Sequence, residues 1–180
     1  EFSDDVSYLN HLCKIAIRLK EFDKAVVWAR HQLEIAKTFP MIRSAISQIM
    51  AAVDSGEKAG RLIRELEAID RLTIQQTCLL SELLESQHLT VKANAVLVEA
   101  ALINPEMASR QQIHIYRLRR DWASAAERVE FLITKTGKRN PNLIRELTEL
   151  YQKSRRYEDG LKWVLVWEKI SPASAPARIY

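Results

Sequence analysis

Apolar residues recur along the chain at spacings of three and four, in short stretches separated by polar turns. The first stretch carries Leu9, Leu12 and Ala16 on one face, and after a turn the next carries Ala25 and Leu33. Such spacing is typical of amphipathic helices with one buried face. The opening of the chain therefore predicts two short helices joined by a tight turn.

This two-helix pattern returns five times. A small residue stands near the start of each second helix, at intervals of 34, 34, 32 and 35 residues, in the set Ala25, Ala59, Ala93, Ala125 and Gly160. A period near 34 built from two helices is typical of a helical solenoid. We therefore predict an all-α fold, a right-handed superhelical solenoid of five helix-turn-helix repeats and ten helices.

The domain organisation follows from the repeat boundaries. Residues 5–172 are expected to form one solenoid, with repeats over 5–40, 41–73, 74–105, 106–141 and 142–172. Residues 1–4 are interpreted as a lead-in or cloning remnant, and 173–180 as a tail or the start of another repeat. Only 4 Gly and 5 Pro occur among 180 residues, and 47% of the chain is hydrophobic, which suits one helical domain with short loops.

Residues within the repeats resemble the tetratricopeptide repeat family. That family places a small residue midway along the first helix, an aromatic at the turn and a small residue opening the second helix. A second small or apolar residue follows seven positions later, and a proline ends the unit. Repeat three matches at Ser81, Ala93, Ala100 and Pro105, and repeat five matches at Tyr151, Tyr157, Gly160 and Pro172. The tryptophan that often opens the first helix is absent. Residues 142–172 are also similar in style to the periplasmic repeat scaffold of Pel-type exopolysaccharide export.

The resemblance implies that the first helices line a groove where partners bind. The groove residues expected to bind are Asn10, Lys14, Gln48, Arg110, His114, Arg117, Arg145 and Glu149. Basic residues gather between Arg110 and Lys162, with thirteen Lys and Arg against seven Asp and Glu. Arg110, His114 and Arg117 share one helix face, so an acidic segment is the expected ligand, although a solvated surface explains the same charges. Trp28 and Trp163 form a second candidate surface, unless each covers a neighbouring turn.

Other chemistry finds little support in the sequence. Cys13 and Cys78 lie 65 residues apart and are expected to be buried thiols, and the four histidines lack the spacing of metal ligands. No nucleotide-binding, metalloprotease or hydrolase motif occurs, and no apolar run is long enough to span a membrane. We expect no catalytic residues, no cofactor, no metal, no nucleic-acid partner and no membrane insertion.

The sequence therefore predicts a non-catalytic scaffold for protein–protein interaction, belonging to a larger repeat protein. Through the resemblance to Pel-type export, it implies recruitment of partners in bacterial exopolysaccharide secretion. The alternative is an adaptor or chaperone that captures acidic peptide segments in its groove. The compartment stays open between periplasm and cytoplasm, and so does the oligomeric state.

Overall fold

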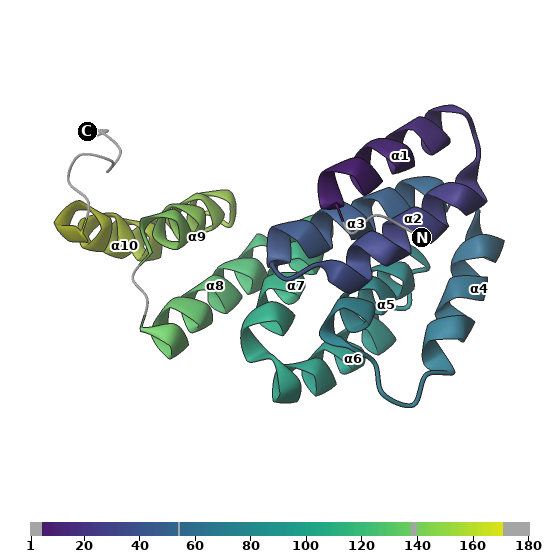
Figure 1. Cartoon of the computed structure of the whole chain (residues 1–180). Coiled ribbons are helices and arrows are strands. Elements are labelled where there is room, and N and C mark those ends of the chain that lie inside the picture. The colour runs from purple at the N-terminus through teal and green to yellow at the C-terminus, as the bar shows by residue number, and fades with distance from the viewer. Residues whose placement is uncertain (1–4, 54, 138–139, 171–180) are drawn as a thin grey trace. The chain divides into compact units, whose positions relative to one another are not determined.

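The computed structural model describes residues 5–53, 55–137 and 140–170, and these ranges contain ten helices and no strand (Figure 1). The prediction of an all-helical chain is therefore confirmed, while the right-handed superhelix stays a prediction. The helices are α1 (Val6–Arg18), α2 (Phe22–Ile35), α3 (Phe39–Ala52), α4 (Gly56–Glu67), α5 (Ile74–Ser86), α6 (Thr90–Ile103), α7 (Pro105–Leu118), α8 (Trp122–Thr136), α9 (Pro141–Lys153) and α10 (Tyr157–Ile170).

Contacts divide the chain into two compact units, Glu1–Ala108 and Ser109–Tyr180, so that the boundary falls within α7. Each unit has a core of its own. In the first unit, Leu33, Ile46, Leu66 and Leu83 are buried in one cluster with residues from α1 to α6. In the second unit, α8 and α9 contribute most of the buried cluster, together with Ile113 and Trp167. In both units the cores form because amphipathic helices stack their apolar faces.

The small residues that recur near the starts of the second helices are buried. Ala25, Ala93 and Ala125 have no exposed surface, and Ala59 has 2%. A Cβ atom added to Gly160 would lie 3.3 Å from Cβ of Tyr151, so α9 and α10 approach closely at this point. A larger side chain at any of these positions would push two helices apart.

Four turns within repeats share one backbone conformation. Lys20, His88, Arg120 and Arg155 have φ values of 61°, 60°, 59° and 60°, in the left-handed region that favours glycine. Each lies five residues before the small residue of its second helix. The amide that follows each one bonds back to the first helix, as Glu21 does to the carbonyl of Ala16 at 2.9 Å. This is the Schellman arrangement, which ends a helix and reverses the chain in few residues.

Capping residues define several helix starts. Thr73 accepts a hydrogen bond from the amide of Gln76, and the Gln76 side chain accepts one from the amide of Thr73, forming a capping box at α5. Asn140 caps α9 ahead of Pro141 by accepting a hydrogen bond from the amide of Asn142. At α3, the N-cap residue Thr38 makes no side-chain capping bond.

Candidate protein-binding site

Polar side chains on successive first helices of the first unit bond to one another. The Gln48 amide on α3 donates to Oδ1 of Asn10 on α1. Farther along, Arg43 on α3 forms a two-pronged ion pair with Glu82 on α5, and its second contact measures 3.2 Å. Gln48 and Glu82 are each only 8% exposed. Two of the predicted groove residues in this unit, Asn10 and Gln48, therefore bond to each other and link α1 to α3.

Cys78 lies beside this ion pair and is fully buried. Burial raises the pKa of the Cys78 thiol to about 12, an effect that nearby Arg43 reduces and Glu82 strengthens. Burial likewise raises the pKa of Cys13 to about 11. Because a thiol reacts through its thiolate, both cysteines are inert buried groups at neutral pH, as their isolation in sequence predicted.

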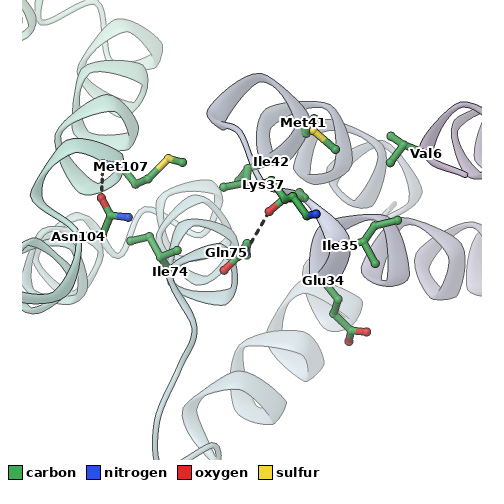
Figure 2. A pocket seen from close by; sticks show the side chains of 11 residues that line it. Val6, Glu34, Ile35, Lys37, Met41, Ile42, Ile74, Gln75, Asn104 and Met107 are labelled. Carbon is green, nitrogen blue, oxygen red and sulfur yellow. Dashed lines mark hydrogen bonds between the residues drawn. The ribbon is translucent and has the colours of Figure 1, made fainter. Parts of the chain in front are cut away.

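The first unit contains a pocket of about 720 Å³ at the ends of its helices, here called the helix-end pocket (Figure 2). Apolar side chains dominate its lining. They are Val6, Ile35, Met41, Ile42, Ile74 and Met107, with Ala36 beside them. Polar groups come from Glu34, Lys37, Gln75 and Asn104. An apolar hollow with a few polar groups is the usual form of a ligand site.

Two of the polar groups in the helix-end pocket already have partners. Gln75 donates to the carbonyl of Ala36 at 3.1 Å, and Asn104 Oδ1 accepts from the amide of Met107 at 3.1 Å (Figure 2). Lys37 and Glu34 are exposed at its edge. The two methionines add soft, unbranched side chains that adapt to different partner shapes. The pocket is therefore apolar inside, with ionic groups at its rim.

First turns of four helices meet at the helix-end pocket. Val6 begins α1, Met41 and Ile42 lie in the first turn of α3, Ile74 begins α5, and Met107 lies in the first turn of α7. Helix N-termini carry partial positive charge and amide groups without helical partners. Thr38 supplies no capping bond at α3, whereas Asp5, Thr73 and Asn104 already accept hydrogen bonds from first-turn amides of the other three helices.

The predicted basic cluster is only partly available to a ligand. Arg117 forms an ion pair with Glu146 at 2.8 Å, which joins α7 to α9 in the second unit. Arg110 and His114 are half-buried. The shared helix face predicted for these residues is present, but the charge of Arg117 is already balanced. Lys14, by contrast, is exposed on α1.

The remaining predicted residues divide between a groove and the cores. Arg145 and Glu149 lie 3.8 Å apart and line a groove of about 430 Å³ between α9 and α10. Trp28 and Trp163 are half-buried and pack against the apolar clusters of the first and second units. This packing favours the interpretation that each tryptophan covers its neighbours.

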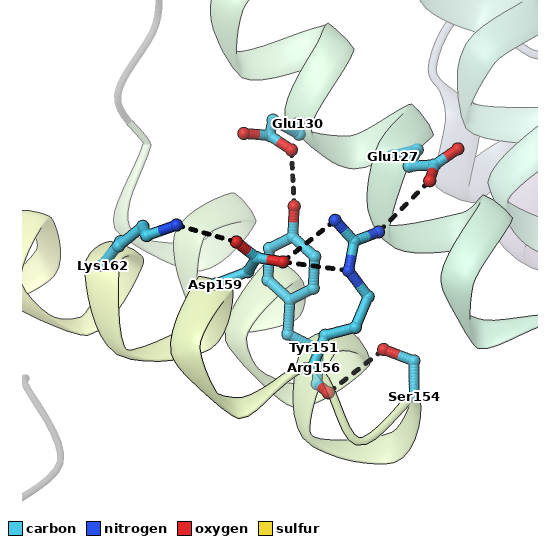
Figure 3. A network of polar contacts seen from close by, with 7 residues as sticks. All are labelled: Glu127, Glu130, Tyr151, Ser154, Arg156, Asp159 and Lys162. Atoms are coloured by element: carbon cyan, nitrogen blue, oxygen red, sulfur yellow. Dashed lines mark hydrogen bonds and ion pairs between the residues drawn. The ribbon is translucent and has the colours of Figure 1, made fainter.

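A polar network in the second unit joins α8, α9 and α10 (Figure 3). Tyr151 donates to Glu130, while Arg156 contacts Glu127 at 3.2 Å and Asp159 at 3.0 Å. Burial and the bond to Glu130 raise the pKa of Tyr151 above its usual range. Hydrogen bonds from Lys162 and Arg156 lower the pKa of the Asp159 carboxyl. The hydrogen bonds and ion pairs of this network therefore link α8 of the fourth repeat to α9 and α10 of the fifth.

The described part of the chain holds neither a metal-ligand group nor a membrane-spanning helix. Within residues 5–53, 55–137 and 140–170, no three His, Cys, Asp or Glu side chains are grouped so that they could hold a metal ion. Across the same part of the chain, no helix is long and apolar enough to cross a membrane.

The helix-end pocket could not be predicted from helical periodicity. Its lining comes from the ends of helices, whereas the predicted site residues lie on helix faces. The sequence carries no signal of the pocket at Thr38, because threonine is a common N-cap residue and its missing capping bond is seen only in the structure. In comparisons with known proteins, no family model matches the chain, and no curated protein matches it.

Proposed function

We propose that this chain is a non-catalytic scaffold that binds a short segment of another protein in the helix-end pocket. The observation that carries the proposal is the pocket of about 720 Å³, lined by six larger apolar side chains and by the first turns of four helices. An apolar hollow offers burial energy, and the uncapped first turn of α3 offers amides to a negative group.

The preferred ligand combines an apolar side chain with a carboxylate. The apolar side chain enters between Met41, Ile74 and Met107, and the carboxylate lies near the start of α3 and Lys37. Glu34 at the rim disfavours a ligand with several negative charges, because like charges repel. A partner segment with one acidic group therefore suits the pocket better than a long acidic run.

Selection from a library of short peptides tests this proposal. Peptides selected on the wild-type chain should lose most of their affinity for Lys37→Glu, which reverses an exposed charge, and for Met107→Trp, which fills the pocket. Lys14→Glu is the matched control, because Lys14 is also an exposed lysine but lies outside the pocket. Unchanged binding to both pocket variants would refute the site. Loss of binding only in Lys14→Glu would favour the predicted first-helix groove.

An adaptor that captures acidic segments through Arg110, His114 and Arg117 stands as the second candidate. The excess of basic residues between Arg110 and Lys162 supports it. The pairing of Arg117 with Glu146 weakens it, since a ligand carboxylate would compete with a side chain already in place. Peptides that bind through this face should lose affinity in Arg110→Glu, most strongly at low salt.

A further inference from the structure

Helix α6, in the interior of the repeat array, carries an exposed apolar face. Its opposite side is held in the core, where Ala93 lies in one buried cluster with residues of α5. Four residues form the exposed face, here called the α6 seam: Val91, Ala95, Val98 and Leu102. Val91, Val98 and Leu102 are 83%, 60% and 87% exposed. Exposed apolar side chains gathered on one helix face are typical of a surface that binds another protein.

The same face of other second helices is charged. The residues of the α6 seam lie two positions before the small residue Ala93 and two, five and nine positions after it. The corresponding positions hold Glu57, Arg61, Arg64 and Ala68 in α4, and Ala123, Glu127, Glu130 and Thr134 in α8. The apolar face is therefore a property of α6 and not a consequence of the repeat pattern.

The spacing within the α6 seam is that of two helices packed against each other. Its four residues are separated by four, three and four positions. Alternating intervals of three and four are the pattern of the apolar positions in a coiled coil, where each side chain enters a hole formed by four residues of the facing helix. The short side chain of Ala95 allows a close approach near the middle of the seam. The spacing therefore favours a helix as the partner.

Charges beside the α6 seam match a second copy of α6 in the opposite orientation. Lys92 directly follows Val91 and Glu99 directly follows Val98, so both exposed side chains lie along one edge of the seam. In an antiparallel pair of identical helices, this edge faces the same edge of the other copy. Lys92 of each copy would then lie opposite Glu99 of the other. In a parallel pair, two different edges face each other, and these two charges would not meet.

We propose that two copies of this chain form a symmetric dimer through antiparallel packing of their α6 seams. The Lys92 ammonium lies 3.8 Å from the Glu67 carboxylate, and 63% of its side chain is exposed, so it can contact a second carboxylate as well. Both copies use the same surface, so association ends at the dimer. One helix from each copy is a small interface, and the dimer should therefore be weak. The inference goes beyond the proposed function and does not depend on the helix-end pocket.

Sedimentation velocity of the whole chain tests the dimer. The wild type should pass from monomer to dimer as its concentration rises from micromolar to millimolar. Val98→Arg should stay monomeric, because it places a charge within the α6 seam, and circular dichroism verifies that this exposed position tolerates the change. Val27→Arg is the matched control, since Val27 is a 51% exposed valine on α2, and it should dimerise as the wild type does. A wild-type chain that stays monomeric would overturn the proposal, as would equal dimerisation of Val98→Arg and the wild type.

Reversal of the two edge charges tests the antiparallel orientation. Lys92→Glu and Glu99→Lys should each weaken dimerisation roughly tenfold, because two exposed attractions between the copies become two repulsions. An equimolar mixture of these two variants should associate as tightly as the wild type, because each copy then faces opposite charges on the other. A mixture that associates no more tightly than either variant alone would refute the antiparallel pairing of the α6 seams.

Discussion

The hydroxyl of Tyr151 on α9 donates a hydrogen bond to the carboxylate of Glu130 on α8, although the ring of Tyr151 is almost wholly buried. The guanidinium of Arg156 lies 5.0 Å from the centre of the same ring. A single side chain thus combines core packing, a hydrogen bond and a cation contact between neighbouring helices.

Tyr151→Phe should lower the free energy of unfolding by about 1 kcal/mol, because it removes this hydrogen bond and retains the buried ring. Urea denaturation monitored by circular dichroism measures the change. Tyr157→Phe is the control, since Tyr157 is 64% exposed and should tolerate the loss of its hydroxyl. Equal effects in the two variants would show that the Glu130 bond contributes nothing.

Ala93→Leu should destabilise the fold by about 1–3 kcal/mol, because Ala93 is fully buried where α5 and α6 pack and has no room for a larger side chain. Thermal melting would show this as a lower midpoint. Val91→Leu, two residues earlier in α6, is the control, because Val91 is 83% exposed. A wild-type melting midpoint for Ala93→Leu would contradict the predicted helix crossing.

Arg155→Gly should stabilise the chain by up to about 1 kcal/mol. Arg155 has a φ of 60°, a left-handed conformation that costs a residue with a side chain about 1 kcal/mol or more. Glycine removes this strain. The extra freedom that glycine gives the unfolded chain offsets part of this gain. Glu99→Gly, on the exposed face of α6, should instead cost about 1 kcal/mol. Chemical denaturation of both variants checks the opposite signs, and a loss of stability in both would refute the argument.

Stability should fall as pH rises above about 9, partly because Cys78 is buried. Its folded pKa of about 12 lies above the ordinary thiol value of 9.0, so the folded state binds the proton more tightly. The contribution of Cys78 to the free energy of unfolding is therefore fully present below pH 9 and decreases as the pH rises toward 12. Urea denaturation at several alkaline pH values should show a shallower decline for Cys78→Ala than for the wild type. Parallel pH profiles would contradict the assignment.

Arg117→Glu should destabilise the second unit by up to about 1 kcal/mol, because it places two carboxylates where an ion pair now joins α7 to α9. The double reversal Arg117→Glu with Glu146→Arg should restore most of that loss. Thermal melting of the two single variants and the double variant forms a complete cycle. Additive losses in the double variant would show that the pair is not coupled.

Helix content and the burial of small residues could be predicted from the sequence because both depend on short-range patterns. Spacings of three and four identify the buried face of a helix, and the recurrence of Ala25, Ala59, Ala93, Ala125 and Gly160 identifies where helices approach. The separation of Cys13 and Cys78 by 65 residues likewise predicted buried thiols, and both are buried and outside any disulfide.

Only the tertiary structure decided which polar residues pair and where a pocket opens. Arg43 and Glu82 are 39 residues apart, and Arg117 and Glu146 are 29 apart, so neither pair follows the repeat period. Helical periodicity indicates which side chains point away from the core. The offset between packed helices determines which of those side chains contact one another. The helix-end pocket depends on the same offsets, because its walls come from the ends of helices that are distant in sequence. The sequence by itself determined the repeated helices and their buried faces, and three-dimensional packing decided the contacts and cavities between them.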